Sequence, residues 1–588
     1  MAEGRRLAIA CLGFLGGLLL AGCAGAPPQI VALEPANNAN GVAADAPVTV
    51  SFDHAVDHGS VAGRFHISPA LPGCEDLRAA FGPVPPSVCR VDWSHDSAAF
   101  TLRHGGALFQ SGTRYSLILD GGVTDPAQVS NGLDHHWGFS TAGAPTLRST
   151  TPGDGATDVG IDSPVGLSFS TAMSSEATGP AISVSPPVEG TRVVQNSRDP
   201  SRLVVVFGVL LNPRTTYAVT VAKGATDAHG APVENATTLR FTTGTGPSGR
   251  DHALVLARRA GQLASAVVLA ATSAQTPGDP LPAATVLEAP RCTADHCGRA
   301  ANGAPLEAYV DAALAPDGRH LAIVARDLAA PVSQDHLDLL DLAGGTTPRR
   351  LAGDADHPAW SPDGRVLAFS SGAGVELLTP GDGGSTRLPP GDRLIGRPSW
   401  SGDGSVLALP VSAAGGMVRV DLADPLLGIR YPVPGVAMAA SQPVLSADGS
   451  LLALELAPAG SARGGTWLVR LRTGDAAPRP LGDALRPVAF GDGGALLALQ
   501  RPTATDPALV RVSVAGGVAG DIDHISTALD GRGVDSLVAG SGGRTLGYVQ
   551  PDDTGIAQAW VENADGSNTM PLTAFAAGGL EAVAVVLP

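Results

Sequence analysis

Six stretches in the C-terminal half of the chain place the same tight turn between two short apolar runs. They read ALAPDGRHLAIV, AWSPDGRVLAFS, SWSGDGSVLALP, VLSADGSLLALE, AFGDGGALLALQ and VAGSGGRTLGYV. The residues before the turn glycine are Asp317, Asp363, Asp403, Asp448, Gly493 and Gly542, at intervals of 46, 40, 45, 45 and 49 residues. This regular recurrence limits the fold more than any other feature of the sequence, because it requires a repeated structural unit.

The composition of the turn predicts a hairpin. Proline fixes φ at the second turn position, aspartate tolerates the third, and glycine accepts a left-handed conformation. The last two copies lack the turn aspartate, so the prediction covers the first four copies. The predicted blade-turn residues are Asp317, Gly318, Asp363, Gly364, Asp403, Gly404, Asp448 and Gly449.

A period near 45 residues with four short strands per repeat is typical of a β-propeller blade. Apolar runs such as VLAF and LLAL fit strands that neighbouring blades cover on both faces. Trp360 and Trp400 share one repeat position and are predicted to be core residues rather than ligand-stacking residues.

Six turns do not limit the propeller to six blades. HALVLARR, ASAVVLAAT and ATVLEAP precede the first turn without an inner partner strand, and EAVAVVLP ends the chain. Together these runs predict a seventh blade, closed by the N- and C-terminal strands of the propeller segment, which also removes an exposed sheet edge.

Residues 251–588 resemble the TolB-like propeller, built from WD-like repeats with S-P-D-G turns. The shared residues identify blades and not a function.

Residues 30–243 contain a duplication with short alternating runs, which predicts β-sandwiches. Proline, valine and phenylalanine recur at steps of 7 and 10 residues, and tyrosine, aspartate and phenylalanine at steps of 10 and 14. The two sets are Pro35, Val42, Phe52, Tyr115, Asp125 and Phe139, then Pro152, Val159, Phe169, Tyr217, Asp227 and Phe241. Residues 30–143 and 144–243 resemble the SbsA-type bacterial Ig-like domain, which implies a spacer or stalk without an active site. GTGPSGR, residues 244–250, is a flexible linker by composition.

The N-terminus predicts export and lipid attachment. Arg5 and Arg6 precede a short apolar run that ends in Leu20-Ala21-Gly22-Cys23. This resembles the lipobox of bacterial lipoproteins, which implies a signal peptide at 1–22, a diacylglycerol on the thiol of Cys23, and an anchor and spacer at 23–29. An ordinary signal peptide with an incidental cysteine is the alternative. The residue after Cys23 is Ala24, so the outer membrane is favoured over inner-membrane retention.

The remaining cysteines agree with an oxidising compartment. Two local pairs predict disulfides, Cys74–Cys89 and Cys292–Cys297. The interval from Phe52 to Tyr115 is fifteen residues longer than that from Phe169 to Tyr217, and the extra residues can be placed in the loop bounded by Cys74 and Cys89. A metal site of Cys292, His296 and Cys297 is the alternative for CTADHC, but structural zinc usually needs four ligands. No metal and no cofactor are predicted.

The other candidate chemical groups have structural explanations. His54 and His58 have helical zinc-ligand spacing but follow a strand, and His135 and His136 precede the closing strand, so all four are predicted to be solvated. Asp354 and Asp356 are a close acidic pair in a loop between repeats. The turns lack the spacing of sialidase-like Asp boxes, and there is no G-x-S-x-G nucleophile elbow. No catalytic residue is therefore predicted.

Charge excludes one class of partner. The chain of 588 residues carries −17, with Lys223 as its only lysine, so it has no basic cluster for nucleic acid. The sequence predicts a lipid-anchored cell-envelope protein, in which an Ig-like stalk presents a propeller whose mouth binds an envelope protein or peptide. The alternatives are a propeller enzyme acting on envelope glycans, as a hydrolase or lyase, and a passive surface-layer component.

Overall fold

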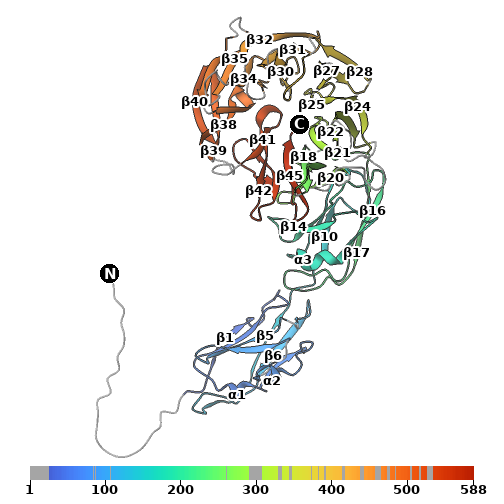
Figure 1. Cartoon of the computed structure of the whole chain (residues 1–588). Helices are drawn as coiled ribbons and strands as arrows, with labels where there is room; N and C mark the ends of the chain where they lie inside the picture. The colour runs from blue at the N-terminus through green and yellow to red at the C-terminus, as the bar shows by residue number, and fades with distance from the viewer. Residues whose placement is uncertain are drawn as a thin grey trace, which may run out of the picture. The chain divides into compact units, whose positions relative to one another are not determined.

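The structure is a computed structural model of an all-β chain (Figure 1). The residues that it describes are 26–83, 85, 88–105, 108–249, 251–259, 261–289, 307–328, 334–343, 347–372, 374–381, 383–389, 392–413, 417–437, 443–456, 465–472, 477–483, 485–503, 506–515, 518–525 and 534–588. Cys23 with the predicted signal peptide, and Cys292, His296 and Cys297, lie outside the described residues. Their lipid attachment and pairing stay predictions.

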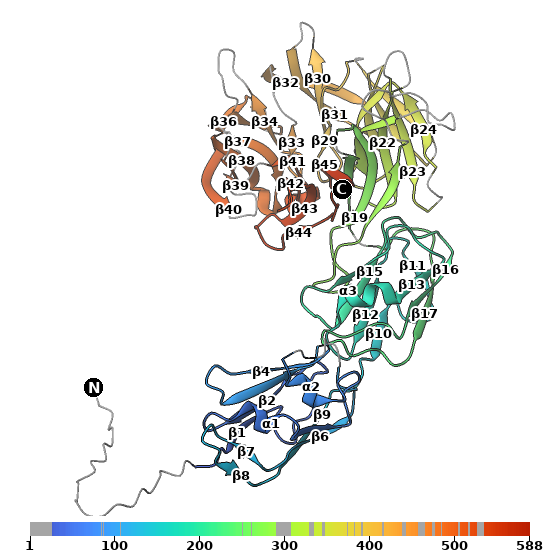
Figure 2. The same ribbon diagram turned by 60° about the horizontal axis from the view of Figure 1, so that its bottom comes forward.

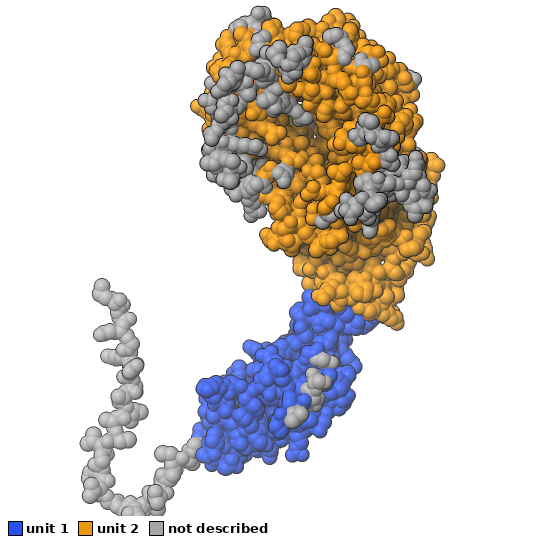
Figure 3. All heavy atoms as spheres, viewed as in Figure 1, with its two compact units in different colours: residues 1–146, 226–234 blue, residues 147–225, 235–588 orange. Residues whose placement is uncertain are grey.

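The chain divides into two compact units, coloured separately in Figure 3. The first comprises residues 1–146 and 226–234, and the second comprises residues 147–225 and 235–588. The first unit contains the first sandwich, and the second contains most of the second sandwich and all the strands that follow it.

The first sandwich has a four-stranded sheet, a three-stranded sheet and a short hairpin. The four-stranded sheet has the order β1 (Ile30–Glu34), β2 (Val48–Phe52), β5 (Ala99–Arg103), β4 (Arg90–Trp93). The second sheet has the order β3 (Phe65–Ser68), β6 (Arg114–Leu119), β9 (His135–Ser140), and the hairpin joins β7 (Val123–Thr124) to β8 (Ser130–Asn131). Two helices are short, α1 (His58–Val61) and α2 (Leu77–Ala80).

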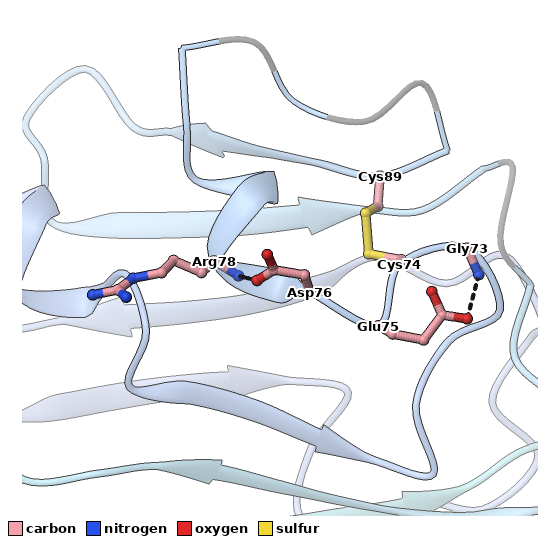
Figure 4. Close-up of a disulfide and its surroundings, with 6 residues drawn as sticks. All are labelled: Gly73, Cys74, Glu75, Asp76, Arg78 and Cys89. Atoms are coloured by element: carbon pink, nitrogen blue, oxygen red, sulfur yellow. Dashed lines mark hydrogen bonds between the residues drawn. A yellow bond between two sulfur atoms is a disulfide. The ribbon is translucent and has the colours of Figure 1, made fainter.

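The extra loop of this sandwich is fixed at its neck by a disulfide between Cys74 and Cys89 (Figure 4). Asp76 caps α2 by accepting a hydrogen bond from the backbone N–H of Arg78 at 3.1 Å. Phe81, next in the loop, packs its ring against Phe100 with centroids 5.4 Å apart. The loop thus contributes to the core, and closing fifteen residues stabilises the fold by about 3 kcal/mol on the chain-entropy model.

The second sandwich repeats the order of the first four-stranded sheet, and its other sheet has one strand more. One sheet is β10 (Leu147–Thr151), β12 (Val165–Phe169), β15 (Arg202–Val206), β14 (Arg192–Gln195). The other is β11 (Ala156–Val159), β17 (Thr237–Thr243), β16 (Thr216–Val221), β13 (Ile182–Ser185), and the short helices are α3 (Ser175–Thr178) and η1 (Gly179–Ala181). In both copies a buried tyrosine accepts a backbone hydrogen bond from five residues upstream: Gln110 to Tyr115, and Asn212 to Tyr217.

Within the described part of residues 251–588, the strands form seven four-stranded antiparallel sheets. The first sheet has the order β20 (Ala283–Glu288), β19 (Ala264–Ala271), β18 (His252–Arg259), β45 (Leu580–Val586). The next three are β21 (Glu307–Leu314), β22 (His320–Asp327), β23 (Asp335–Asp341), β24 (Arg349–Gly353); β25 (Ala355–Trp360), β26 (Leu367–Ser371), β27 (Gly374–Thr379), β28 (Gly384–Leu388); and β29 (Ser399–Trp400), β30 (Leu407–Ala413), β31 (Met417–Asp424), β32 (Ile429–Ala437). The last three are β33 (Val444–Leu445), β34 (Leu451–Leu456), β35 (Gly465–Arg470), β36 (Arg479–Asp483); β37 (Leu485–Phe490), β38 (Leu496–Thr503), β39 (Asp506–Ala515), β40 (Val518–Ile525); and β41 (Asp535–Ala539), β42 (Thr545–Pro551), β43 (Ala557–Asn563), β44 (Met570–Pro571). Two short helices at turns are η3 (Asp492–Gly494) and η4 (Ser541–Gly543).

Consecutive sheets bury their faces against one another around a common centre (Figures 1 and 2). The last strand, β45, pairs with β18 in antiparallel register, from Leu254 opposite Val586 to Arg259 opposite Leu580. Apolar residues of β18, β19 and β45 share one buried cluster with residues of β42 and β43. The two ends of residues 251–588 therefore belong to the same sheet and the same core.

The repeated turns have a hydrogen-bonding role for serine that the sequence analysis did not assign. In the second, third and fourth copies, a buried serine donates its hydroxyl to the turn aspartate, as Ser446 does to Asp448 at 2.7 Å. The same serine accepts the backbone N–H of Leu451 at 2.9 Å. This hydroxyl, with the backbone N–H and hydroxyl of Ser450, lowers the pKa of Asp448 to about 2.

Both repeat tryptophans connect neighbouring sheets. The indole N–H of Trp360 in β25 donates to the carbonyl of Ala313 in β21 at 3.2 Å, and Trp400 in β29 donates to Ala359 in β25 at the same distance. The two rings are half-buried and pack against the apolar clusters between these sheets. Each tryptophan thus contributes both packing and a specific hydrogen bond between sheets.

The segment predicted as a flexible linker is hydrogen-bonded in its described part. Ser248 donates its hydroxyl to Asp162 at 2.6 Å, and the same carboxylate bonds His252 of β18 at 2.9 Å. Nearby, Arg202 of β15 makes a bidentate pair with Asp279, and both side chains are buried, at 7% and 1% exposure. The composition indicated flexibility, but the contact of Ser248 with Asp162 holds the described part of the segment. The Arg202–Asp279 pair separately joins the second sandwich to the residues between β19 and β20.

We predict that deleting residues from Glu581 onward strongly destabilises residues 251–588. The deletion leaves β18 as an open edge and removes the buried Ala582, Val585 and Val586. The free energy of unfolding should fall by about 3–6 kcal/mol, because buried side chains and ladder hydrogen bonds are lost together. Differential scanning calorimetry of the parent and truncated chains measures this, with the transition of the first sandwich as internal control. An unchanged thermal profile would contradict the prediction.

Candidate functional site

A charged cluster lies on the first strands of two consecutive sheets and just before the first strand of the next sheet, β29. Asp311, His357 and Arg397 each stand six residues before a turn aspartate, so they share one repeat position. The first strands of neighbouring sheets contact one another, as β21 does with β25 and β33 with β37. Residues at this position are therefore brought together although they are far apart in sequence.

Backbone irregularities direct these side chains. The pairing of β21 with β22 shifts between Tyr309 and Asp311, which places Asp311 opposite Val324 on the face that packs against the next sheet. The pairing of β25 with β26 shifts between Asp356 and Ala359, and His357 has φ +52°. A β-bulge with a left-handed residue re-aims a side chain that a regular strand would point elsewhere.

The cluster is closely connected. One guanidinium nitrogen of Arg397 donates both to the carboxylate of Asp311 and to the carbonyl of Ala312, the latter at 2.8 Å. The Nδ1 atom of His357 lies 3.8 Å from the other carboxylate oxygen of Asp311. The three side chains are 21–32% exposed, so the cluster is shielded but accessible to solvent.

The electrostatic balance keeps Asp311 ionised. Burial acts to raise its pKa, but the charge of Arg397 and the hydrogen bonds of His357 and Arg397 outweigh burial. The pKa of Asp311 is therefore below its usual value. An ionised, arginine-paired carboxylate is a poor proton donor at neutral pH and a good acceptor of hydrogen bonds.

The segment 392–397 supplies further ion pairs to two different sheets. Arg393 lies 3.1 Å from Asp354 and 3.3 Å from Asp356. Asp392 lies 2.7 Å from Arg419 of β31. The acidic pair singled out in the sequence is thus neutralised by one arginine, and the segment ties three neighbouring sheets together.

The cluster lacks the elements of nucleophilic catalysis in the described chain. Within that part, no Ser, Thr or Cys side chain hydrogen-bonds to His357, and no group of three or more His, Cys, Asp or Glu side chains is placed to hold a metal ion. What the geometry provides is a fixed set of donors and acceptors of both charges. Such a set can recognise a polar or charged group, and it also holds the sheets together.

The remaining sequence candidates do not join this cluster. His58 stacks on Trp93 with ring centroids 3.8 Å apart, and His54 pairs with its neighbour Asp53, so the two histidines do not converge. His135 and His136 begin β9 rather than preceding it. The blade-turn aspartates lie in their hairpins and accept hydrogen bonds from backbone N–H groups. Those of the second to fourth copies also accept serine hydroxyls.

The sequence analysis missed Asp311, His357 and Arg397. Aligning the repeats on the turn aspartate and reading six positions back would have aligned these three ionisable residues. The later copies have Gln442, Pro487 and Ser536 at this position. The ionisable residues of the first three copies were the available signal.

Comparison with known families supports the duplicated sandwich. Residues 24–141 and 142–243 each match the family described as the bacterial Ig-like domain. The predicted domains, 30–143 and 144–243, correspond to these matches, and the SbsA type stays a prediction. No curated protein sequence matches the chain.

Solved structures similar to the chain include TolB-like and other propellers. TolB from Acinetobacter baumannii is 17% identical, with a TM-score of 0.34 over 46% of this chain and 67% of that one. The propeller domain of the Trilobed protease from Pyrococcus furiosus is 13% identical, with a TM-score of 0.34 over 45% and 85%. Porphyromonas gingivalis dipeptidyl peptidase 4 is 13% identical, with a TM-score of 0.35 over 55% of this chain and 52% of that one. This chain therefore spans about half the length of that peptidase.

One further structural observation concerns membranes. In the part of the chain that the structure describes, no helix has both the length and the apolar character needed to span a bilayer.

We predict that Arg397→Gln makes stability more sensitive to acid. In the parent, the lowered pKa of Asp311 stabilises the fold above the unfolded pKa of about 3.9, and this contribution is lost as pH falls through the lower folded value. Without Arg397, burial dominates, the pKa of Asp311 rises, and stability is lost at higher pH. Thermal unfolding between neutral and acid pH measures this shift.

The control is Arg365→Gln, which removes the same charge from an arginine that is 83% exposed. Its partner Asp363 is mostly exposed, so this variant should shift the pH profile much less than Arg397→Gln does. Equal profiles for Arg397→Gln and the parent would contradict the coupling of Arg397 to Asp311.

Proposed function

We propose that the chain is a lipid-anchored protein of the cell envelope, with the outer membrane favoured, in which Ig-like domains carry a propeller that binds a protein or peptide partner. The two matches to the bacterial Ig-like domain support the stalk. The LAGC sequence at 20–23 supports lipid attachment at Cys23. The membrane is then one partner, through the lipid, and an envelope protein or peptide is the other.

We further propose that residues 251–588 are a seven-bladed propeller closed by both chain ends. The pairing of β45 with β18 supports this arrangement. In the sheet that contains β18, the last strand of the chain takes the edge position that the first strand takes in each of the other six sheets. The shared core of β18 and β45 with β42 and β43 supports contact between the last and first sheets. A closed ring of sheets gives a rigid scaffold for a binding face.

The observation that carries the binding role is the charge balance of the cluster of Asp311, His357 and Arg397, which we call the central cluster. Asp311, Asp354 and Asp356 each lie beside an arginine from the segment 392–397. Paired charges at fixed positions suit recognition of polar groups on a partner, whereas general acid–base catalysis needs a group with its pKa near the working pH. We therefore infer binding at the propeller mouth without chemical turnover.

A propeller enzyme acting on envelope glycans is the second candidate, and one observation favours it. In the sheet β21–β24, burial raises the pKa of Glu307 in β21, while the pKa of Asp338 in β23 is lowered. His336 is buried and lies 3.6 Å from Glu307 and 3.4 Å from Asp338. Carboxylates with separated pKa values can share acid and base roles. A passive surface-layer role would use neither group.

We predict that Cys23→Ser abolishes lipid attachment. The substitution removes the thiol that would carry the diacylglycerol, so metabolic labelling with a palmitate analogue should be lost and the protein should leave the membrane fraction. Cys11→Ser, within the same N-terminal apolar run, is the matched control and should keep both properties. Persistent labelling of the Cys23→Ser chain would contradict lipid attachment at this residue.

We predict that the full-length chain captures one envelope partner saturably and without turnover. Affinity purification from envelope extracts identifies the partner, and assays for released sugars and peptides run in parallel. Because the chain carries −17, a basic partner should associate faster at low salt.

Variants locate the interface and separate the two candidate functions. Asp311→Asn should weaken partner binding about tenfold, by loss of a charge-assisted contact. Asp553→Asn, at an exposed aspartate remote in sequence from the cluster, should not change it. Turnover that is lost in Glu307→Gln would overturn the binding role in favour of the enzyme.

A further inference from the structure

The turn between β31 and β32 is apolar and exposed (Figure 1). It reads PLLG at 425–428, and of the described residues Leu426 is the most exposed large apolar side chain, at 94%. Leu427 is 69% exposed, and Ile429 and Tyr431 on β32 are both 51% exposed. We call these four side chains the apolar tip. None of these described residues belongs to the apolar clusters between neighbouring sheets, so packing within the chain does not account for them.

The corresponding turn is polar or glycine-rich in other sheets of residues 251–588. The residues between the third and fourth strands are PGDG at 380–383, GG at 516–517 and ADGSNT at 564–569. Glycine, proline, aspartate, asparagine and serine are usual in such turns, because their backbones or side chains favour turn conformations. The hairpin therefore does not require two adjacent leucines, and exposing them to water is unfavourable. Exposed apolar surface of this kind marks a contact with another molecule.

The backbone N–H groups of the turn have partners within the hairpin. One carboxylate oxygen of Asp424 accepts the N–H of Leu426 at 2.9 Å and that of Leu427 at 3.0 Å. The carbonyl of Asp424 accepts the N–H of Gly428 at 3.0 Å, and Pro425 has no N–H. Gly428 has φ +66°, which closes the turn. The turn can thus enter an apolar medium without an unpaired backbone donor, as a lipid environment requires.

The charged side chains of this hairpin are already paired. The Arg430 side chain is fully buried and lies 2.6 Å from Asp421, which is buried as well. The carboxylate of Asp424 is occupied by two backbone N–H groups. Residues 424–431 therefore present no exposed cation to an anionic surface, and the chain as a whole carries −17. The tip suits an uncharged apolar medium, whereas an anionic surface repels the chain.

The size of the apolar tip favours a lipid surface over a protein surface. A stable protein interface buries about 800 Å² of each partner and takes roughly 20–30 residues from it. The tip offers four large side chains at one end of one hairpin. Tyr431 lies two residues beyond Ile429 along β32, about 7 Å at the rise of a strand. When the leucines enter the hydrocarbon, Tyr431 reaches the headgroup level, which accommodates both its ring and its hydroxyl.

We propose that the apolar tip inserts into the surface of a lipid bilayer, with Leu426 and Leu427 in the acyl region and Tyr431 among the headgroups. The contact is shallow and reversible, because two leucines bury less apolar surface than an acyl anchor does. The proposal rests on the proposed lipid attachment at Cys23, which would keep the hairpin beside a membrane. Tethering would raise the effective concentration of bilayer at the tip, so a weak contact suffices.

Flotation with phosphatidylcholine vesicles tests this contact. The chain lacking residues 1–25 keeps every described residue and has neither Cys23 nor the N-terminal apolar run, so its binding reports the tip and not the anchor. This chain should bind phosphatidylcholine vesicles, and it should bind vesicles that also contain phosphatidylglycerol more weakly, because the chain is acidic. Palmitate labelling of the full-length chain tests the anchor, so the two proposals fail in different measurements.

A double variant and a matched control locate the contact. Leu426→Ser with Leu427→Ser should weaken vesicle binding at least tenfold, because it removes the side chains that enter the hydrocarbon. Val518→Ser with Ile522→Ser removes two exposed apolar side chains from the edge strand β40 and should leave binding unchanged. Thermal unfolding reports that both variants fold.

Three vesicle results would each overturn the proposal: no binding of the parent to phosphatidylcholine, an equal effect of the double variant and its control, or binding that requires phosphatidylglycerol. Loss of an envelope protein partner in the double variant, with no vesicle binding by the parent, would assign the tip to that protein instead of a bilayer.

Discussion

The pairing of β45 with β18 joins residues more than three hundred positions apart and connects the end of the chain to the first sheet of residues 251–588. It gives the edge strand β18 a partner. It also brings Val585 into one core with Val549 of β42 and Val561 of β43, which belong to the last sheet. An unpaired apolar strand edge is an aggregation risk, and antiparallel pairing with the terminal strand removes it. In the closed propeller that we propose, the intermediate sheets stack between these two ends.

Between neighbouring sheets of residues 251–588, polar contacts determine the relative placement of the sheets. Tryptophan N–H groups reach the backbone of the preceding sheet, and Arg397 reaches Asp311 across the strand that carries His357. The apolar clusters supply most of the burial, but they are not directional. Buried and half-buried hydrogen bonds are directional, so they select one relative placement of the sheets and also leave a patterned polar surface. The same residues can therefore serve stability and recognition.

Local chemistry made much of the fold predictable from the sequence. HALVLARR, with its continuous apolar run, corresponds to β18, and the positive φ of Gly364 and Gly404 agrees with the turn composition. The central cluster was not predicted, because Asp311 and Arg397 meet only through long-range stacking and β-bulges that no short motif encodes. The segment 244–250 was assigned as flexible for a related reason: Ser248 is fixed by a distant carboxylate, Asp162. Local composition reports propensity, whereas these contacts depend on tertiary structure.

The central claim of this account is that the terminal strand is an integral part of the first sheet. Hydrogen–deuterium exchange with mass spectrometry on the full-length chain tests it directly, because backbone N–H groups in a stable ladder exchange only through opening of that ladder. The account predicts that peptides covering β45 and β18 are protected to the same high degree, comparable with β42. Fast exchange of β45, together with an unprotected β18 edge, would contradict it.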